Sequence, residues 1–144
     1  MRKSCVRLVV LLALSVPATD VVAQEQDEVL QVVVDAGRRE FQRSCASCHG
    51  EDAKGNGPVA AMLWEKPADL TQMSARHGGV FLFWRTYEKI SGEDEVVIRG
   101  HGTREMPIWG ERFRFDRNAG DGEKAGVRGR ILSLVHYLQS IQTK

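Results

Sequence analysis

Residues 45–49 read Cys-Ala-Ser-Cys-His, and this short stretch restricts both the fold and the chemistry of the 144-residue chain. On a helical turn, positions i, i+3 and i+4 share one face. Cys45, Cys48 and His49 can therefore present two thiols and one imidazole in the same direction. The pattern Cys-x-x-Cys-His is the attachment signal for a c-type haem. We expect the two thiols to reach the vinyl groups while the imidazole of His49 points at the iron.

Two other uses of a cysteine pair fit the sequence less well. A thioredoxin-like redox disulfide needs a βαβ context, and none is visible. A zinc site needs further soft ligands, and the one other cysteine, Cys5, lies in a segment that we expect to be removed. We therefore predict one haem c, attached covalently through Cys45 and Cys48.

The first 23 residues have the features of a secretory signal peptide. Arg2, Lys3 and Arg7 precede an apolar run over 8–16, and Val21-Val22-Ala23 supplies small residues for cleavage. The run is about half the ~20 residues that a membrane span needs. We expect a signal peptide over 1–23 and a single domain over 24–144, soluble in the periplasm or another exported, oxidising space and without an integral membrane segment.

The charge of the expected mature chain is close to balanced. Three of the 20 basic residues and one of the 19 acidic residues lie within 1–23. The remainder lacks the strong positive charge that nucleic-acid or membrane-surface binding requires, so we expect neither.

Hydrophobic spacing predicts a mostly helical, all-α domain without internal repeats. Leu30, Val33, Val34, Gly37 and Phe41 recur at helical spacing. Further predicted segments are a loose polar arm over 24–28, a glycine-rich loop over 50–58, short turns over 59–64 and 68–74, helices over 80–90 and 93–99, an exposed loop over 118–129 and an amphipathic helix over 131–141.

Across roughly Val29 to Ile141 the chain resembles a class I c-type cytochrome. The resemblance is carried by Gly37-x-x-x-Phe41 before the cysteine motif, by Met106-Pro107, and by Leu134-x-x-Tyr137-Leu138 near the end. It implies a small cytochrome c-like fold in which the first and last helices cross around one haem. It also implies that Gly37 lies at the crossing, that Met106 is the second iron ligand, and that the carbonyl of Pro58 accepts the N–H of His49.

The chemistry of a thioether supports Met106 independently. It is a soft, neutral ligand, which together with histidine raises the reduction potential and fills the sixth position of the iron. His101 is the main competitor. Met62 and Met73 have apolar neighbours and are expected in the core, whereas we expect His77 in an exposed loop and a structural role for His136.

Aromatic and aliphatic residues near these motifs are candidates to line the haem. Trp109 and Trp64 fit either that role or a plain core role, and the sequence does not separate the two. On the same grounds we name Leu63, Leu70, Phe83 and Ile108.

These features predict a one-electron transfer protein and not an enzyme in itself. We expect protein donors and acceptors, with a basic rim formed by Arg99, Arg104, Arg112 and Arg114. An alternative is the cytochrome subunit of an exported oxidoreductase complex, a dehydrogenase or an oxidase, with the segment 110–129 as its interface. A third interpretation is a haem enzyme or gas sensor with an open iron.

Overall fold

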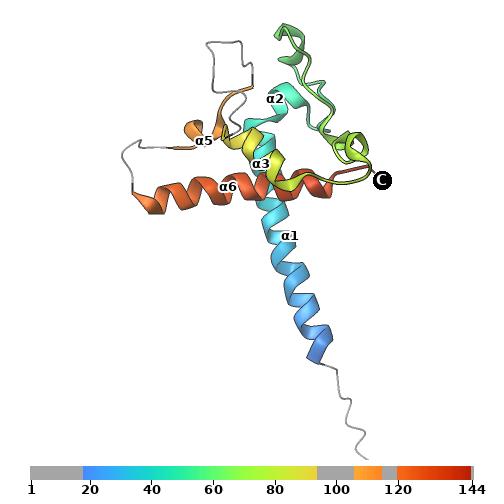
Figure 1. Ribbon diagram of the computed structural model, residues 1–144, viewed down its shortest axis with the longest axis vertical. Coiled ribbons are helices and arrows are strands. Elements are labelled where there is room, and N and C mark those ends of the chain that lie inside the picture. The colour runs from blue at the N-terminus through green and yellow to red at the C-terminus, as the bar shows by residue number, and fades with distance from the viewer. Residues whose placement is uncertain (1–17, 94–105, 115–119, 144) are drawn as a thin grey trace, which may run out of the picture.

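The fold is helical, and Figure 1 shows it as a computed structural model that describes residues 18–93, 106–114 and 120–143. No strand occurs within these ranges, which confirms the all-α prediction. The predicted helix over 93–99 falls, apart from its first residue, outside them. The elements in chain order are α1 (Ala18–Ser44), α2 (Ala46–His49), the 3₁₀ turns η1 (Ala60–Met62), η2 (Leu70–Gln72) and η3 (Ala75–His77), then α3 (Phe83–Ser91), α5 (Trp109–Arg112) and α6 (Asp121–Ser140).

Helices α1 and α6 cross closely at Gly37, as the sequence predicts (Figure 1). A Cβ at Gly37 would overlap the backbone carbonyl of Ser133 and lie 2.9 Å from the Cβ of Tyr137. The absent side chain lets the two backbones approach. One turn further along α1, the ring of Phe41 packs on the ring of Tyr137 with centroids 5.3 Å apart.

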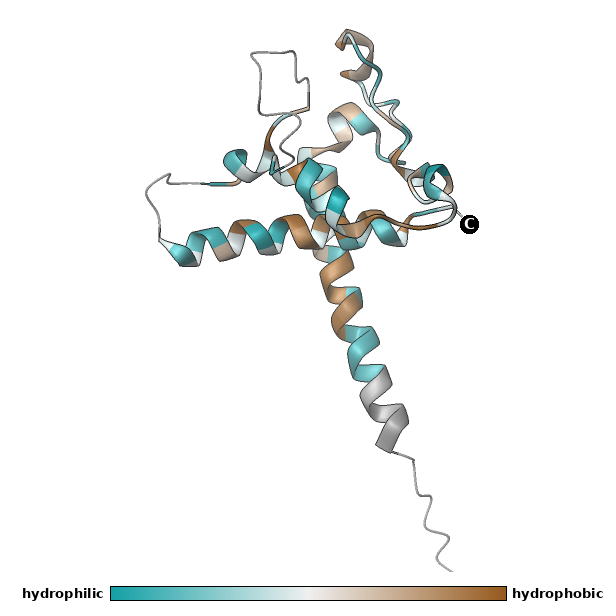
Figure 2. Ribbon diagram, in the orientation of Figure 1, coloured by the Kyte–Doolittle hydropathy of each residue, from teal (hydrophilic) through white to brown (hydrophobic). Residues whose placement is uncertain are grey.

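The main core lies around this crossing, where apolar ribbon segments gather in Figure 2. Its largest fully buried side chains are Phe41, Ile131, Leu134 and Val135. Burial of each such side chain contributes about 1.5–3 kcal/mol to folding. These residues come from the ends of the domain, so the core joins its first and last helices.

Helix α1 begins earlier than the sequence suggests. The segment 24–28, predicted as a loose arm, is helical and continuous with the rest of α1. Glutamine and glutamate have good intrinsic helix propensity, so a polar composition does not prevent a helix here. Beyond the crossing, this half of α1 extends away from the body of the molecule (Figure 1), and Val29 and Val32 are exposed.

Helix α6 also begins earlier than predicted. The described part of the expected loop over 118–129 is helical from Asp121 onward. Asp121 and Glu123 lie in the first turn, where negative charge is favourable at a helix N-terminus. The side chain of Val127 is buried and anchors this half of the helix. These contributions offset the glycines, each of which costs about 1 kcal/mol in a helix.

The long segment between α2 and α3 is tied to the C-terminus by hydrogen bonds. The side chain of Gln142 donates to the carbonyl of Leu70 over 2.8 Å and accepts from the backbone N–H of Ser74 over 2.8 Å. The N–H of Thr143 donates to the carbonyl of Thr71. As predicted, this segment contains a glycine-rich loop and short turns separated by Pro67.

Helix α3 packs on α6 and ends at Gly92, whose φ of 87° lies in the left-handed region that favours glycine. It covers most of the helix predicted over 80–90. Within the described ranges, no helix combines the length and the apolar character needed to span a bilayer.

We predict that Gly37→Ala lowers the free energy of unfolding by about 1–3 kcal/mol, because the added methyl group overpacks the helix crossing. Gly126→Ala is the matched control, since a Cβ at this glycine of α6 meets no atom within 4 Å. It should raise stability by up to about 1 kcal/mol through helix propensity. Chemical denaturation of both variants checks this, and equal effects would contradict a close crossing.

Candidate functional site

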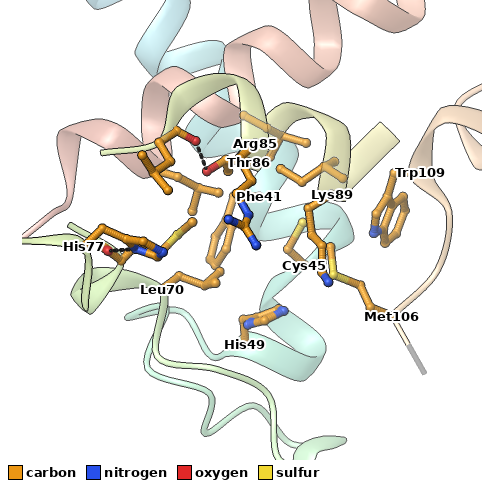
Figure 3. Close-up of a pocket in the computed structure, with 15 residues that line it drawn as sticks. Phe41, Cys45, His49, Leu70, His77, Arg85, Thr86, Lys89, Met106 and Trp109 are labelled. Carbon is orange, nitrogen blue, oxygen red and sulfur yellow. Dashed lines mark hydrogen bonds between the residues drawn. The ribbon is translucent and has the colours of Figure 1, made fainter. Parts of the chain in front are cut away.

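A mainly apolar cavity of about 270 Å³ lies beside the α1–α6 crossing and contains most of the predicted site residues. Elements α1, α2, α3, α5, α6 and the turns η2 and η3 all contribute to its wall. Its lining residues are Phe41, Cys45, His49, Leu70, Met73, His77, Leu82, Arg85, Thr86, Lys89, Ile90, Met106, Trp109, Leu134 and Leu138. In Figure 3, Met106 and Trp109 lie at one end of this cavity and His77 lies at the other.

His49 is the last residue of α2, and one of its ring nitrogens is fixed by the backbone. Nδ1 lies 3.2 Å from the carbonyl oxygen of Ala68, so Nδ1–H donates and Nε2 is left to act as a ligand. Burial lowers the pKa of His49, partly offset by the Ala68 carbonyl, which raises it. A neutral imidazole with a hydrogen bond at its far nitrogen is the form in which histidine binds metals.

The acceptor of this bond differs from the prediction, which named Pro58. Pro58 is exposed, and the carbonyl beside His49 belongs to Ala68. The reason lies in how the loop is folded: Gly55 donates its N–H to the carbonyl of His49, and Pro67 passes directly over Gly55. A Cβ at Gly55 would overlap the carbonyl oxygen of Pro67.

Cys45 joins α1 to α2 and lines the cavity, while Cys48 is half-buried just outside its lining. Both are free thiols. Burial, assisted by the charges of Glu40 and Cys48, raises the pKa of Cys45 to about 12. A thiol that stays protonated at neutral pH does not fit the low-pKa nucleophile of a thioredoxin-like site.

Met106 and Trp109 reach the cavity from a segment held against α3. Gly92, which ends α3, packs on the side chain of Ile108, and Gly110 packs on the carbonyl of Ser91. Short α5 then places Trp109 in the wall of the cavity. Met106 and His49 therefore line the same cavity from different parts of the chain. His101, the competing ligand, lies outside the described residues.

Three ionisable residues that line the cavity, His77, Arg85 and Lys89, are absent from the predicted site. His77, expected as a plain loop residue, is exposed but lines the cavity, with Nδ1 2.9 Å from the carbonyl of Met73. Arg85 and Lys89 also line it, from successive turns of α3. Their i, i+4 spacing, which places both on one face of a helix, is the sequence signal that could have identified them.

Several candidate lining residues lie elsewhere. Trp64 is 97% exposed and Met62, expected in the core, is 81% exposed. Both lie at or beside η1, outside the core. Leu70 and Met73 do line the cavity, whereas Leu63, Phe83 and Ile108 do not. His136 packs its ring on Phe83 with centroids 4.9 Å apart, which agrees with a structural role.

Only half of the expected basic rim can be placed, since Arg99 and Arg104 lie outside the described residues. Arg114 is paired with Glu111 over 3.3 Å. The guanidinium of Arg112 lies 5.7 Å from the ring centre of Trp109. The segment 110–129, expected as one interface loop, contains α5 and the start of α6.

The donor set of the cavity fits a haem of c type. An imidazole nitrogen, a thioether and a cysteine thiol meet in an apolar space, with two cationic side chains on its wall. Apolar walls suit a porphyrin face, and cations suit its carboxylate groups. The arrangement is that of a c-type cytochrome, a protein class that transfers electrons.

Comparison with known proteins assigns the family within that class. A family model described as "Cytochrome C oxidase, cbb3-type, subunit III" matches residues 32–118, and the chain belongs to this family. A curated relative is the "Cbb3-type cytochrome c oxidase subunit FixP" of Rhizobium meliloti (strain 1021), which is 39% identical over 61 residues. The match covers 36% of this chain and 21% of the relative, so the chain spans only about a fifth of the relative's length. No solved structure matches the chain.

We predict that, in the haem-loaded protein, Gly55→Ala raises the reduction potential of the haem. Displacing Pro67 and Ala68 would weaken the hydrogen bond that makes the His49 imidazole more basic, and with it His49 as a candidate ligand. Gly78→Ala is the control, since Gly78 also has a left-handed φ, of 64°, but a Cβ there meets no atom within 4 Å. Both variants should lose stability through backbone strain. Redox titration separates them, and equal potentials would exclude the Ala68 contact as a tuning element.

Proposed function

We propose that this chain carries one haem c, bound covalently through Cys45 and Cys48 and ligated by His49 and Met106. The observation that supports it best is the meeting of His49 and Met106 at one apolar cavity beside Cys45. When bound, the haem supplies an iron that gains and loses one electron. His49 and Met106 would both bind this iron, and the mainly apolar walls of the cavity would limit the access of water to it.

Each ligand residue has a distinct task in this proposal. His49, oriented by the Ala68 carbonyl, would bind the iron through Nε2. Met106 supplies the neutral thioether that favours the reduced state. With both positions filled, small molecules do not reach the iron, which favours an electron carrier over an oxygen-binding or peroxidatic enzyme. Trp109 lines the same end of the cavity as Met106 (Figure 3).

Arg85 and Lys89 are assigned to the carboxylates of the haem. Both are exposed, and yet both line the cavity, so they stand between the apolar interior and solvent. A guanidinium and an ammonium in this position would bind the two propionate groups by charge-assisted hydrogen bonds. They would also orient the ring with its carboxylates toward α3.

A second function, as the electron-transferring subunit of a cbb3-type oxidase complex, is favoured by the family match over 32–118. In that role the haem would pass electrons to a catalytic subunit, whereas a free carrier would shuttle between separate donor and acceptor proteins. We further propose cleavage after Ala23 and a periplasmic or other exported location, supported by the charge and apolar pattern of 1–23. Co-purification of the chain with a catalytic oxidase subunit favours the second function; isolation as a monomer that still exchanges electrons favours the first.

We predict that the ferric protein has the weak near-infrared band of sulfur-to-iron charge transfer and that Met106→Ala abolishes it. The variant should also bind carbon monoxide in its reduced form, because the sixth position is then open. Optical spectra of protein made with haem-attachment machinery check this. Met73→Leu is the control, since Met73 lines the same cavity from a different element. Loss of the band in Met73→Leu with retention in Met106→Ala would reassign the ligand.

We predict that Lys89→Gln lowers the reduction potential, because removal of a cation beside the haem carboxylates disfavours the extra electron. A tenfold change in the equilibrium between oxidation states corresponds to about 59 mV for one electron. Lys124→Gln is the control, since Lys124 is paired with Asp121 in the first turn of α6. A potential that moves equally in both variants would point to net charge alone and not to a propionate contact.

A further inference from the structure

The side chain of Glu40 is a buried carboxylate that the proposed electron-transfer role leaves without a task. Only 7% of its surface is exposed. One carboxylate oxygen accepts from the Ser44 hydroxyl over 2.7 Å. The other accepts from Nε and Nη2 of Arg130, over 3.1 Å and 3.0 Å. A buried charge is stable only when paired and hydrogen-bonded, so Glu40 fixes the place of the Arg130 guanidinium.

Arg130 in turn covers an aromatic ring from a third part of the chain. Its guanidinium carbon lies 3.9 Å from the ring centre of Phe113, within the range of a cation–π contact. Phe113, at the end of α5, is almost fully buried. The pair therefore joins α1, which leads into the cysteine motif, to the segment that follows Met106.

The chain of contacts continues from Phe113 to the wall of the cavity. The rings of Phe113 and Trp109 pack with centroids 5.1 Å apart. Trp109 and Met106 both line the cavity, at the same end of it in Figure 3. On its other side the segment rests on α3 through Gly110 and Ser91. The segment is thus held between α3 and the Arg130 guanidinium.

We propose that the Glu40–Arg130 ion pair is a positioning device for the Met106 segment: by fixing Phe113 and Trp109, it keeps the thioether of Met106 directed into the cavity. This proposal deepens the proposed function and rests on it where Met106 is taken as an iron ligand. Neither Glu40 nor Arg130 lines the cavity, so both act through the aromatic pair.

The experiment measures how often Met106 leaves the iron. Imidazole binds ferric haem only in that open state, so its apparent affinity rises in proportion to the open population. In the purified haem protein, Arg130→Met should tighten imidazole binding about tenfold by raising that fraction. Glu40→Gln, which keeps a hydrogen-bonding side chain at the position, should act in the same direction with a smaller effect. Amide hydrogen exchange should become faster over 106–114 but not at the α1–α6 crossing.

Arg38→Met is the matched control, because the guanidinium carbon of Arg38 also lies over an aromatic ring, 6.0 Å from the ring centre of Tyr137 at the α1–α6 crossing. It should leave imidazole affinity unchanged. Equal affinities for Arg130→Met and Arg38→Met, or faster exchange throughout the core, would overturn the proposal and leave the ion pair a general stabilising contact. If the wild type lacks the sulfur-to-iron band, methionine ligation fails, but local exchange over 106–114 still decides whether the pair positions the segment.

Discussion

The close approach of α1 and α6 at Gly37 is the constraint on which the rest of the structure depends. Because glycine has no side chain, the carbonyl of Ser133 lies where a Cβ would be. This brings Phe41 onto Tyr137 and directs Cys45, one turn further on, toward the space beside Leu134 and Leu138. A wider crossing would move the cysteine motif away from the wall that α6 provides.

The opposite wall of the cavity is built from segments with little regular structure, and each is held by specific polar contacts. Gln142 binds the backbone at Leu70 and Ser74, and Ala68 accepts from His49. Gly92 and Gly110 allow Ile108 and Ser91 to pack closely, which places the chain after Met106. A two-helix frame thus supports a Met106 segment whose position depends on a few contacts.

The sequence predicted the elements whose signals are local. Three predicted elements depend only on neighbours within a few positions, and the fold confirms them: the helical turn that ends at His49, the helix around Gly37 and the last helix. Polar composition was the poorest guide, since both 24–28 and 121–129 are helical despite it. Helix propensity and a single buried anchor such as Val127 outweigh composition over a turn or two.

Contacts between residues far apart in the sequence could not be predicted from local patterns. The bond from His49 to Ala68 spans 19 positions and depends on the path of a glycine loop, whereas the family resemblance implied the carbonyl of Pro58. Arg85, Lys89 and His77 line the cavity only because α3 and η3 fold back over it. The pairing of Glu40 with Arg130, 90 positions apart, leaves no mark in either local sequence.

The crossing at Gly37 also affects the order in which parts of the domain fold. Among the described residues the main partner of helix α1 is α6, so closing the core joins segments separated by nearly the whole domain. Contacts of such long range form late and slowly, since the entropy of closing the loop must be overcome first. During that interval the cysteine motif stays open to an enzyme that modifies thiols. Once the helices meet, Cys45 is only partly exposed on the cavity wall, so the haem attachment that we propose would be easiest before the core closes.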